Sequence, residues 1–108
     1  MTLTLFDTHA HLNTDAFDGI VDDVITRAKE AGVVGINVVG VDVKTSRRAC
    51  ELAAEYPDYL FATIGIQPNS AAEAAEGDFA LIQAMINQPG VKAIGETGLD
   101  CYWDDTPL

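Results

Sequence analysis

The feature that most constrains this chain is a regular alternation of short apolar runs and amphipathic helical patterns. Four apolar runs are expected to be strands, and a helical pattern follows each of the first three. The second and third runs have the nearly continuous apolar character of strands buried on both faces. Successive runs begin about 25–32 residues apart. The expected strands are Leu3–Phe6, Val33–Val41, Tyr59–Ile66 and Val91–Gly95. Strands alternating with helices predict an α/β fold whose parallel sheet is built from right-handed βαβ units.

Apolar spacing and end signals define three helices between these strands. The expected helices are residues 17–31, Lys44–Tyr56 and Phe79–Ile86. Gly32 suits the position just past the end of the first helix, and Asp42 suits the N-cap of the second. Residues 70–73 fit a capping box, although Gly77 interrupts the helix that this box would begin. Residues 13–19 are expected to form a connecting loop.

Chain length limits how the sheet can close. At 108 residues the chain is long enough for one domain with a core and too short for two. The alternation fits a small doubly wound open sheet or part of a (β/α)8 barrel, which typically needs about 250 residues. We predict that residues 1–108 form a single partial barrel domain, truncated after the fourth strand. This domain would be the N-terminal half of a TIM-type (β/α)8 barrel, with about four strands and three helices.

Charge and cysteine content narrow the class of protein. The formal net charge is −11, and a surface of this sign repels nucleic acid and anionic membranes unless cations intervene. Lys44, Arg47 and Arg48 are too few for a nucleic-acid patch and indicate a solvated helix face. No leader pattern or long apolar run occurs, so we expect no membrane partner. Cys50 and Cys101 lack metal-binding spacing and indicate free thiols, which favours a cytoplasmic location.

Both histidines of the chain lie at the end of the first expected strand, in Asp7-Thr8-His9-Ala10-His11. Residues i and i+2 of a strand point to the same face, so His9 and His11 are expected to project together, with Asp7 on that face. Two imidazoles with a carboxylate behind them are a plausible start of a metal site. Taken alone, the simpler interpretation is that these polar residues close a strand.

Polar residues follow the other expected strands as well, and functional groups of parallel α/β folds gather at the carboxyl ends of strands. They are Asp42 after the second strand, Gln67 and Asn69 after the third, and Glu96 and Asp100 after the fourth. Gly40, Gly65 and Gly95 precede several of them and allow backbone or ligand to approach closely. Glu96 adds a third potential ligand to the histidine pair, and this set suits Zn²⁺, Mn²⁺ or a similar ion.

Three segments carry a family resemblance, and they follow one another in a fixed order and spacing. They are Phe6-Asp-Thr-His-Ala-His-Leu, Gly65-Ile-Gln-Pro and Ile94-Gly-Glu-Thr-Gly-Leu-Asp-Cys-Tyr-Trp-Asp. Together they resemble the TatD-type metal-dependent DNases, hydrolases of the amidohydrolase-like (β/α)8 barrel group. His-x-His alone is a weak signal, but it is strong in combination with Gly-Glu-x-Gly-Leu-Asp. The resemblance covers this whole chain but only about the N-terminal two-fifths of a typical family member.

The resemblance implies metal ligands at three positions. His9 and His11 would bind one divalent ion, and Glu96 would bridge it to a second, with Mg²⁺, Mn²⁺ or Zn²⁺ as the cofactor pair of the full-length protein. The substrate would be DNA, whose phosphodiester bond two metals clamp while they lower the pKa of a bound water. The family completes the pair with two later histidines and an aspartate, and this chain has no histidine beyond His11. We therefore expect the 108-residue chain alone to bind metal weakly and to hydrolyse little or nothing.

Other positions depart from the family pattern or stay open. The family usually has a histidine where Gln67 stands and often one near Asn69, so these two residues and Asp100 are expected on the substrate side. Gln67, Asn69 and Asp100 are equally explained as loop or turn residues. Cys101 replaces a tyrosine common in the last motif. Tyr102 and Trp103 fit stacking on a nucleobase as well as packing under a loop.

Two alternatives to a DNase stay open at this point. One is a different metal-dependent hydrolase of the same barrel group, acting on an amide or an ester. The other is a non-catalytic fragment that self-associates or needs a partner, because a half-barrel leaves its first and fourth strands as open sheet edges.

Overall fold

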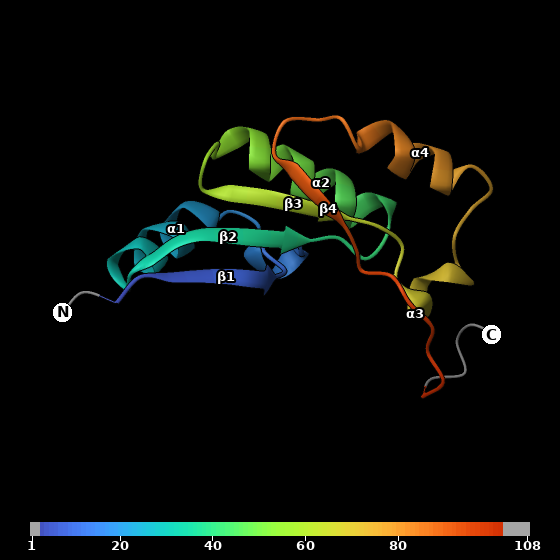
Figure 1. Ribbon diagram of the computed structural model, residues 1–108, viewed down its shortest axis with the longest axis horizontal. Helices are drawn as coiled ribbons and strands as arrows, with labels where there is room; N and C mark the ends of the chain where they lie inside the picture. Colours follow the sequence, from blue (N-terminus) through green and yellow to red (C-terminus); the bar gives the residue numbers. More distant parts are fainter. Residues whose placement is uncertain (1–2, 103–108) are drawn as a thin grey trace.

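The computed structural model describes residues 3–102 and shows one sheet with helices along it (Figure 1). The strands are β1 (Leu5–Ala10), β2 (Val33–Val39), β3 (Leu60–Ile64) and β4 (Val91–Ile94). The helices are α1 (Val21–Glu30), α2 (Val43–Glu55), α3 (Pro68–Ala71) and α4 (Asp78–Met85), with a 3-10 turn, η1, at Asp15–Phe17.

The four strands are parallel and lie side by side in sequence order, β1-β2-β3-β4. Within this sheet β1 pairs only with β2, and β4 only with β3, so β1 and β4 are its edges. The predicted α/β alternation and parallel pairing are confirmed. Parallel neighbours need a crossover connection, and α1, α2 and α4 supply one between each pair of strands.

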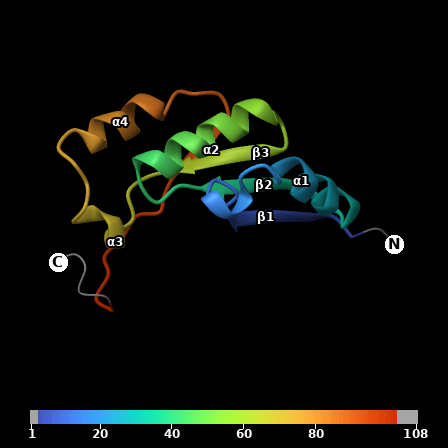
Figure 2. The same ribbon diagram turned by 180° about the vertical axis from the view of Figure 1, so that it is seen from behind.

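The helices α1 and α2 lie along one face of the sheet, and α4 packs against α2 (Figures 1 and 2). The core lies between α2 and the middle strands. Its fully buried side chains include Val38 from β2, Leu52 from α2, and Leu60 and Ile64 from β3. Burial of such side chains stabilises the fold by about 1.5–3 kcal/mol each. The apolar spacing that predicted the second helix therefore comes from its contact with β2 and β3.

The opposite face of the sheet carries no helix in the described part of the chain. Phe6 and Phe61 stack there with ring centroids 6.0 Å apart, and Phe6 keeps 49% of its surface exposed. With Thr8, Asn37 and Lys92 the two rings line a shallow hollow of about 350 Å³. The expectation that the second and third strands are buried on both faces holds for most of β3 and for the end of β2, where successive residues are buried. It fails at the start of β2, where Val34 is exposed, because the helices cover only one side of the sheet.

The ends of the first two helices follow the predicted chemistry. The carboxylate of Asp42 accepts a hydrogen bond from the backbone N–H of Thr45, and the hydroxyl of Thr45 in turn accepts from the backbone N–H of Asp42. This reciprocal pair is a capping box, so the predicted N-cap is confirmed. Gly32 follows the end of α1 with φ +95°, a conformation that costs glycine little.

Several boundaries differ from the prediction: the first helix begins at Val21 instead of residue 17, and β2 and β3 are each two to three residues shorter than expected. The first strand runs from Leu5 to Ala10 instead of Leu3 to Phe6, because pairing with β2 extends through Asp7 and on to Ala10 despite their polar neighbours. The connection at 13–19 contains the turn η1. Ser70 is not an N-cap: it lies inside α3, whose N-cap is Gln67 and whose first turn starts at Pro68. Proline is well suited to that position because its missing N–H has no partner in a first turn.

Both cysteines are free, as predicted, with Cys50 buried and Cys101 exposed. Among residues 3–102, none of the helices is long and apolar enough to cross a membrane. The cytoplasmic location stays a prediction. Trp103 lies outside the described residues.

Candidate metal centre

The carboxyl ends of the four strands lie at the same end of the sheet, beside α3 (Figure 1). His9 belongs to β1, and His11 follows its last residue. Glu96 comes two residues after the end of β4, at the opposite edge of the sheet. The structure therefore brings together groups from the two edge strands, which do not pair with each other.

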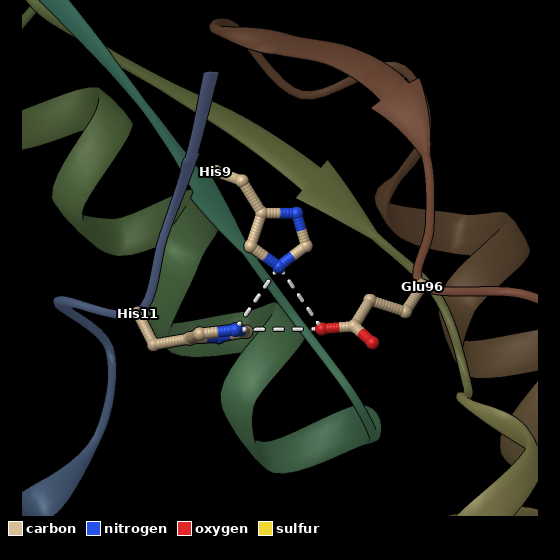
Figure 3. A group of neighbouring side chains, drawn as sticks. All are labelled: His9, His11 and Glu96. Carbon is tan, nitrogen blue, oxygen red and sulfur yellow. Dashed lines mark hydrogen bonds and ion pairs between the residues drawn. The ribbon is translucent and has the colours of Figure 1, made fainter. Parts of the chain in front are cut away.

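The side chains of His9, His11 and Glu96 point toward a common centre (Figure 3). The Nε2 atoms of the two histidines are 3.2 Å apart. The Oε2 atom of Glu96 lies 3.3 Å from Nε2 of His9 and 3.4 Å from Nε2 of His11. The three ligand atoms thus form a nearly equilateral triangle, and the side chains around it are 32–55% exposed.

This triangle fits a divalent ion. Zinc bonds to imidazole nitrogen and carboxylate oxygen are about 2.0–2.2 Å long, so the ligands of a tetrahedral site lie about 3.3–3.6 Å from one another. The observed edges of 3.2, 3.3 and 3.4 Å are close to this spacing. Two nitrogens and one oxygen are also a donor set that Zn²⁺, Mn²⁺ and similar ions accept. Three ligands would fill three of the four positions of a tetrahedral site.

The histidines are oriented by different partners. The Nδ1 atom of His11 lies 3.0 Å from the carbonyl oxygen of Val39 at the end of β2. Since a carbonyl only accepts, Nδ1 carries the proton, and the lone pair of the neutral ring is on Nε2, which faces the triangle. The carboxylate of Asp7 does not back an imidazole, contrary to the expectation. Its Oδ1 accepts from the backbone N–H of His9 at 3.0 Å and so shapes the strand.

Glu96 reaches the histidines because its backbone crosses the end of β3. The N–H of Gly95 donates to the carbonyl of Ile64 in β3, and the N–H of Glu96 donates to Gly40, just past β2, both at 2.9 Å. Gly65 lies under this crossing. A Cβ atom at Gly65 would meet the carbonyl oxygen of Gly95 at 2.7 Å. Gly65, one of the three glycines predicted to allow close approach, therefore lets the segment after β4 pass inward.

The three residues expected on the substrate side are only partly brought together. The amide of Asn69 donates to Oδ2 of Asp100 at 2.6 Å, which joins the segment after β3 to the segment after β4. Gln67 is the N-cap residue of α3, and its side-chain amide donates to the hydroxyl of Ser70. Gln67 is therefore engaged within its own short helix.

One residue at this centre was missed by sequence reasoning. Asn13 was placed in a connecting loop, yet it is buried and its amide donates to the same Val39 carbonyl that His11 contacts. An asparagine directly after the His-x-His-Leu segment was its only signal, and asparagine is common in loops.

Comparison with known proteins places the chain in a family. The family model for TatD related DNase matches residues 6–108. The chain therefore belongs to the TatD-related DNase family, and the resemblance found in its motifs is confirmed.

Two relatives illustrate the range of described activities. The chain is 47% identical over 103 residues to the uncharacterized metal-dependent hydrolase YabD of Bacillus subtilis, covering 95% of this chain and 40% of that protein. It is 38% identical over 96 residues to the 3'-5' ssDNA/RNA exonuclease TatD of Dickeya dadantii, covering 89% and 36%. The chain thus spans about two-fifths of the length of these relatives.

Solved structures agree with this assignment. The crystal structure of YJJV, a TatD homologue from Escherichia coli, superposes with a TM-score of 0.84 at 29% identity, covering 97% of this chain and 41% of that one. A hydrolase of the TatD family from Entamoeba histolytica gives a TM-score of 0.75 at 28% identity, covering 93% and 39%. The four-stranded sheet is accordingly the N-terminal half of a TIM barrel, and its uncovered face corresponds to the barrel interior.

Proposed function

We propose that this chain supplies one part of a divalent-metal centre that hydrolyses phosphodiester bonds of DNA. His9 and His11 hold one ion, and Glu96 bridges it to a second in the full-length protein. The observation that carries the proposal is the triangle of two imidazole nitrogens and one carboxylate oxygen, with edges of 3.2–3.4 Å, built from opposite edges of the sheet. The names of the relatives, a metal-dependent hydrolase and an ssDNA/RNA exonuclease, support it.

The side chains of this chain do the positioning. His11 donates through Nδ1 to Val39 and presents Nε2 as a ligand. Glu96 would offer Oε2 to the same ion, and its carboxylate would serve as a ligand to a second ion in the full-length protein. A divalent cation in this place supplies Lewis-acid polarisation of a phosphate oxygen and lowers the pKa of water. It also offsets the charge of the acidic surface toward a polyanionic substrate.

The substrate side of the centre is assigned to the joined segments after β3 and β4. The hydrogen bond between Asn69 and Asp100 holds these two segments together beyond the carboxyl ends of β3 and β4. Gln67 contributes through the start of α3. We propose that these three residues contact the nucleic acid next to the scissile phosphate.

Metal binding tests the centre directly. The chain is titrated with Zn²⁺ or Mn²⁺ by calorimetry, alongside the single variants His9→Ala, His11→Ala and Glu96→Gln. Loss of one of three ligands is expected to weaken binding at least 10-fold, while the control Glu73→Gln, which removes an exposed carboxylate elsewhere, leaves it unchanged. A wild-type chain that binds no better than Glu96→Gln would exclude the proposed centre.

Hydrolysis is tested on single-stranded DNA with Mg²⁺ or Mn²⁺, beside an amide and an ester substrate that probe the alternative hydrolase classes. We expect little or no turnover by the 108-residue chain, because the later histidines and the aspartate of the family are not in it. Turnover that disappears in His9→Ala would show that three ligands suffice and would contradict this expectation.

A further inference from the structure

Asn13 is a buried amide that joins three separate segments of the chain. Only 6% of the surface of Asn13 is exposed. The residue lies between the end of β1, the end of β2 and the start of α2. Its Nδ2 atom donates to the carbonyl oxygen of Val39 at 3.0 Å and to that of Thr45 at 2.8 Å. Both N–H groups of the amide are therefore used.

The Val39 carbonyl is shared with a metal-ligand candidate. Nδ1 of His11 and Nδ2 of Asn13 each lie 3.0 Å from the same oxygen. A backbone carbonyl oxygen has two lone pairs, so it accepts from both side chains at once. Asn13 thus attaches the loop after β1 to the carbonyl oxygen of Val39. The same oxygen determines which ring nitrogen of His11 carries the proton.

The amide oxygen of Asn13 makes no comparable contact among the described residues. Oδ1 is buried and has no hydrogen-bond partner within residues 3–102. A buried acceptor without a partner is destabilising, and a leucine of similar shape would avoid this cost. The hydrogen bonds that this side chain makes are therefore those of its two N–H groups.

The neighbours of Asn13 hold the loop but do not reach the Val39 carbonyl. Leu12 is buried in the core, and the hydroxyl of Thr14 donates to the backbone carbonyl of His11 at 3.1 Å. These contacts place the backbone of His11. The direction of the ring depends on the shared carbonyl, where Asn13 is the second donor.

We propose that Asn13 is a positioning residue for the metal centre. By docking the loop after β1 onto Val39 and Thr45, it holds His11 as the Nδ1–H tautomer with Nε2 facing Glu96. This inference rests on the proposed metal centre for its role, but the orientation of His11 is a property of the metal-free chain. The two claims can therefore be tested separately.

The test compares Asn13→Leu with Tyr59→Phe. Asn13→Leu keeps the shape of the side chain and removes both donors. Tyr59→Phe is the matched control, because the Tyr59 hydroxyl donates to the Val33 carbonyl at the other end of the same strand, at 2.8 Å. Each variant removes a side-chain bond to a carbonyl of β2, and urea unfolding measures what each loses in stability.

The first readout is the tautomer of His11, measured by long-range ¹H–¹⁵N spectra of the metal-free chain at a pH where imidazole is neutral. We expect the Nδ1–H form alone in wild type and in Tyr59→Phe, and a mixture of both tautomers in Asn13→Leu. The second readout is Zn²⁺ affinity, expected to fall at least 10-fold in Asn13→Leu only. A purely structural role would lower stability without changing the tautomer.

An Asn13→Leu chain with wild-type tautomer and affinity would overturn the proposal. If Asn13→Leu does not fold, the wild type still decides: a side-chain amide of Asn13 that exchanges with water as fast as an exposed one would show that the clamp is absent, and a protected one supports it. A wild type that binds no Zn²⁺ would exclude the metal centre, while the tautomer comparison would still decide the role of Asn13.

Discussion

At the scale of the residue, burial decides which groups are chemically available. His9, His11 and Glu96 keep a third to a half of their surface exposed, as ligands for an incoming ion must. Cys50 shows the opposite case. Burial, with a smaller contribution from the neighbouring carboxylate of Glu51, raises the pKa of the Cys50 thiol. Cys101 is exposed.

This contrast predicts unequal thiol reactivity. With a thiol reagent at pH 8 we expect Cys101 to react at once and Cys50 to react at least about 100-fold more slowly. The thiolate is the reactive form, and the folded chain must open before the reagent reaches Cys50. Cys101→Ser isolates the slow reaction. Equal rates for the two thiols in the native chain would show that Cys50 is accessible.

The raised pKa of Cys50 also predicts a pH dependence of stability. In the unfolded chain the Cys50 thiol ionises at its ordinary pKa, which is lower than its pKa in the folded chain. The protonated thiol therefore contributes to the stability of the fold below the ordinary pKa, and this contribution is lost as the pH rises through the pKa of the folded chain. Between pH 7 and pH 10 we expect the Cys101→Ser variant to lose more free energy of unfolding than the double variant Cys101→Ser/Cys50→Ala, as measured by urea unfolding. Parallel pH curves would contradict this.

At the scale of the element, the proposed metal centre depends on a crossing of two chain segments. Glu96 reaches the histidines only because residues 95–96 pass over the end of β3 at Gly65. The contact is between backbones, so no side-chain rotation relieves a clash there. The position of Glu96, in the segment after β4, therefore depends on Gly65, which directly follows β3.

Gly65→Ala is expected to destabilise the chain by about 1–3 kcal/mol and to weaken Zn²⁺ binding, because the new Cβ displaces Gly95 and Glu96. Gly35→Ala is the control: the three atoms nearest to a Cβ there all belong to the ring of Phe6, which is half exposed and can rotate. Urea unfolding and calorimetry measure both effects. Equal losses in the two variants would show that the crossing is not special.

At the scale of the whole molecule, the chain is half of a barrel with its inner face uncovered. Within residues 3–102 the outer edges of β1 and β4 have no neighbouring strand, and Phe6 and Phe61 line an apolar hollow on the uncovered face. Open edges and exposed apolar surface favour association with another chain. The net charge of −11 opposes it, and salt weakens that repulsion.

We therefore expect the isolated chain to self-associate as its concentration rises, and more so in high salt. Analytical ultracentrifugation measures the mass. Phe61→Lys should shift the equilibrium toward monomer, whereas Phe79→Lys, on an exposed residue of α4 away from the sheet, should not. A chain that stays monomeric at every concentration and salt would contradict this prediction.

The sequence by itself determined the order of strands and helices, the capping of α2 by Asp42 and the chemical type of the three ligand candidates. These features are local: they depend on apolar periodicity, on a side chain within reach of its own helix turn, and on residue identity. The same locality made the first strand appear too short, because Asp7 and His9 look unlike a strand until β2 pairs with them.

Only the tertiary structure decided which of these groups meet. The distances between Glu96 and the two histidines depend on the twist of the sheet and on the crossing at Gly65. The spacing of residues along the sequence predicts neither of them. The same holds for Asn13, which is an ordinary loop residue until β2 and α2 bring Val39 and Thr45 to its amide. Contacts between segments distant in sequence arise from packing, so they cannot be read from either segment alone.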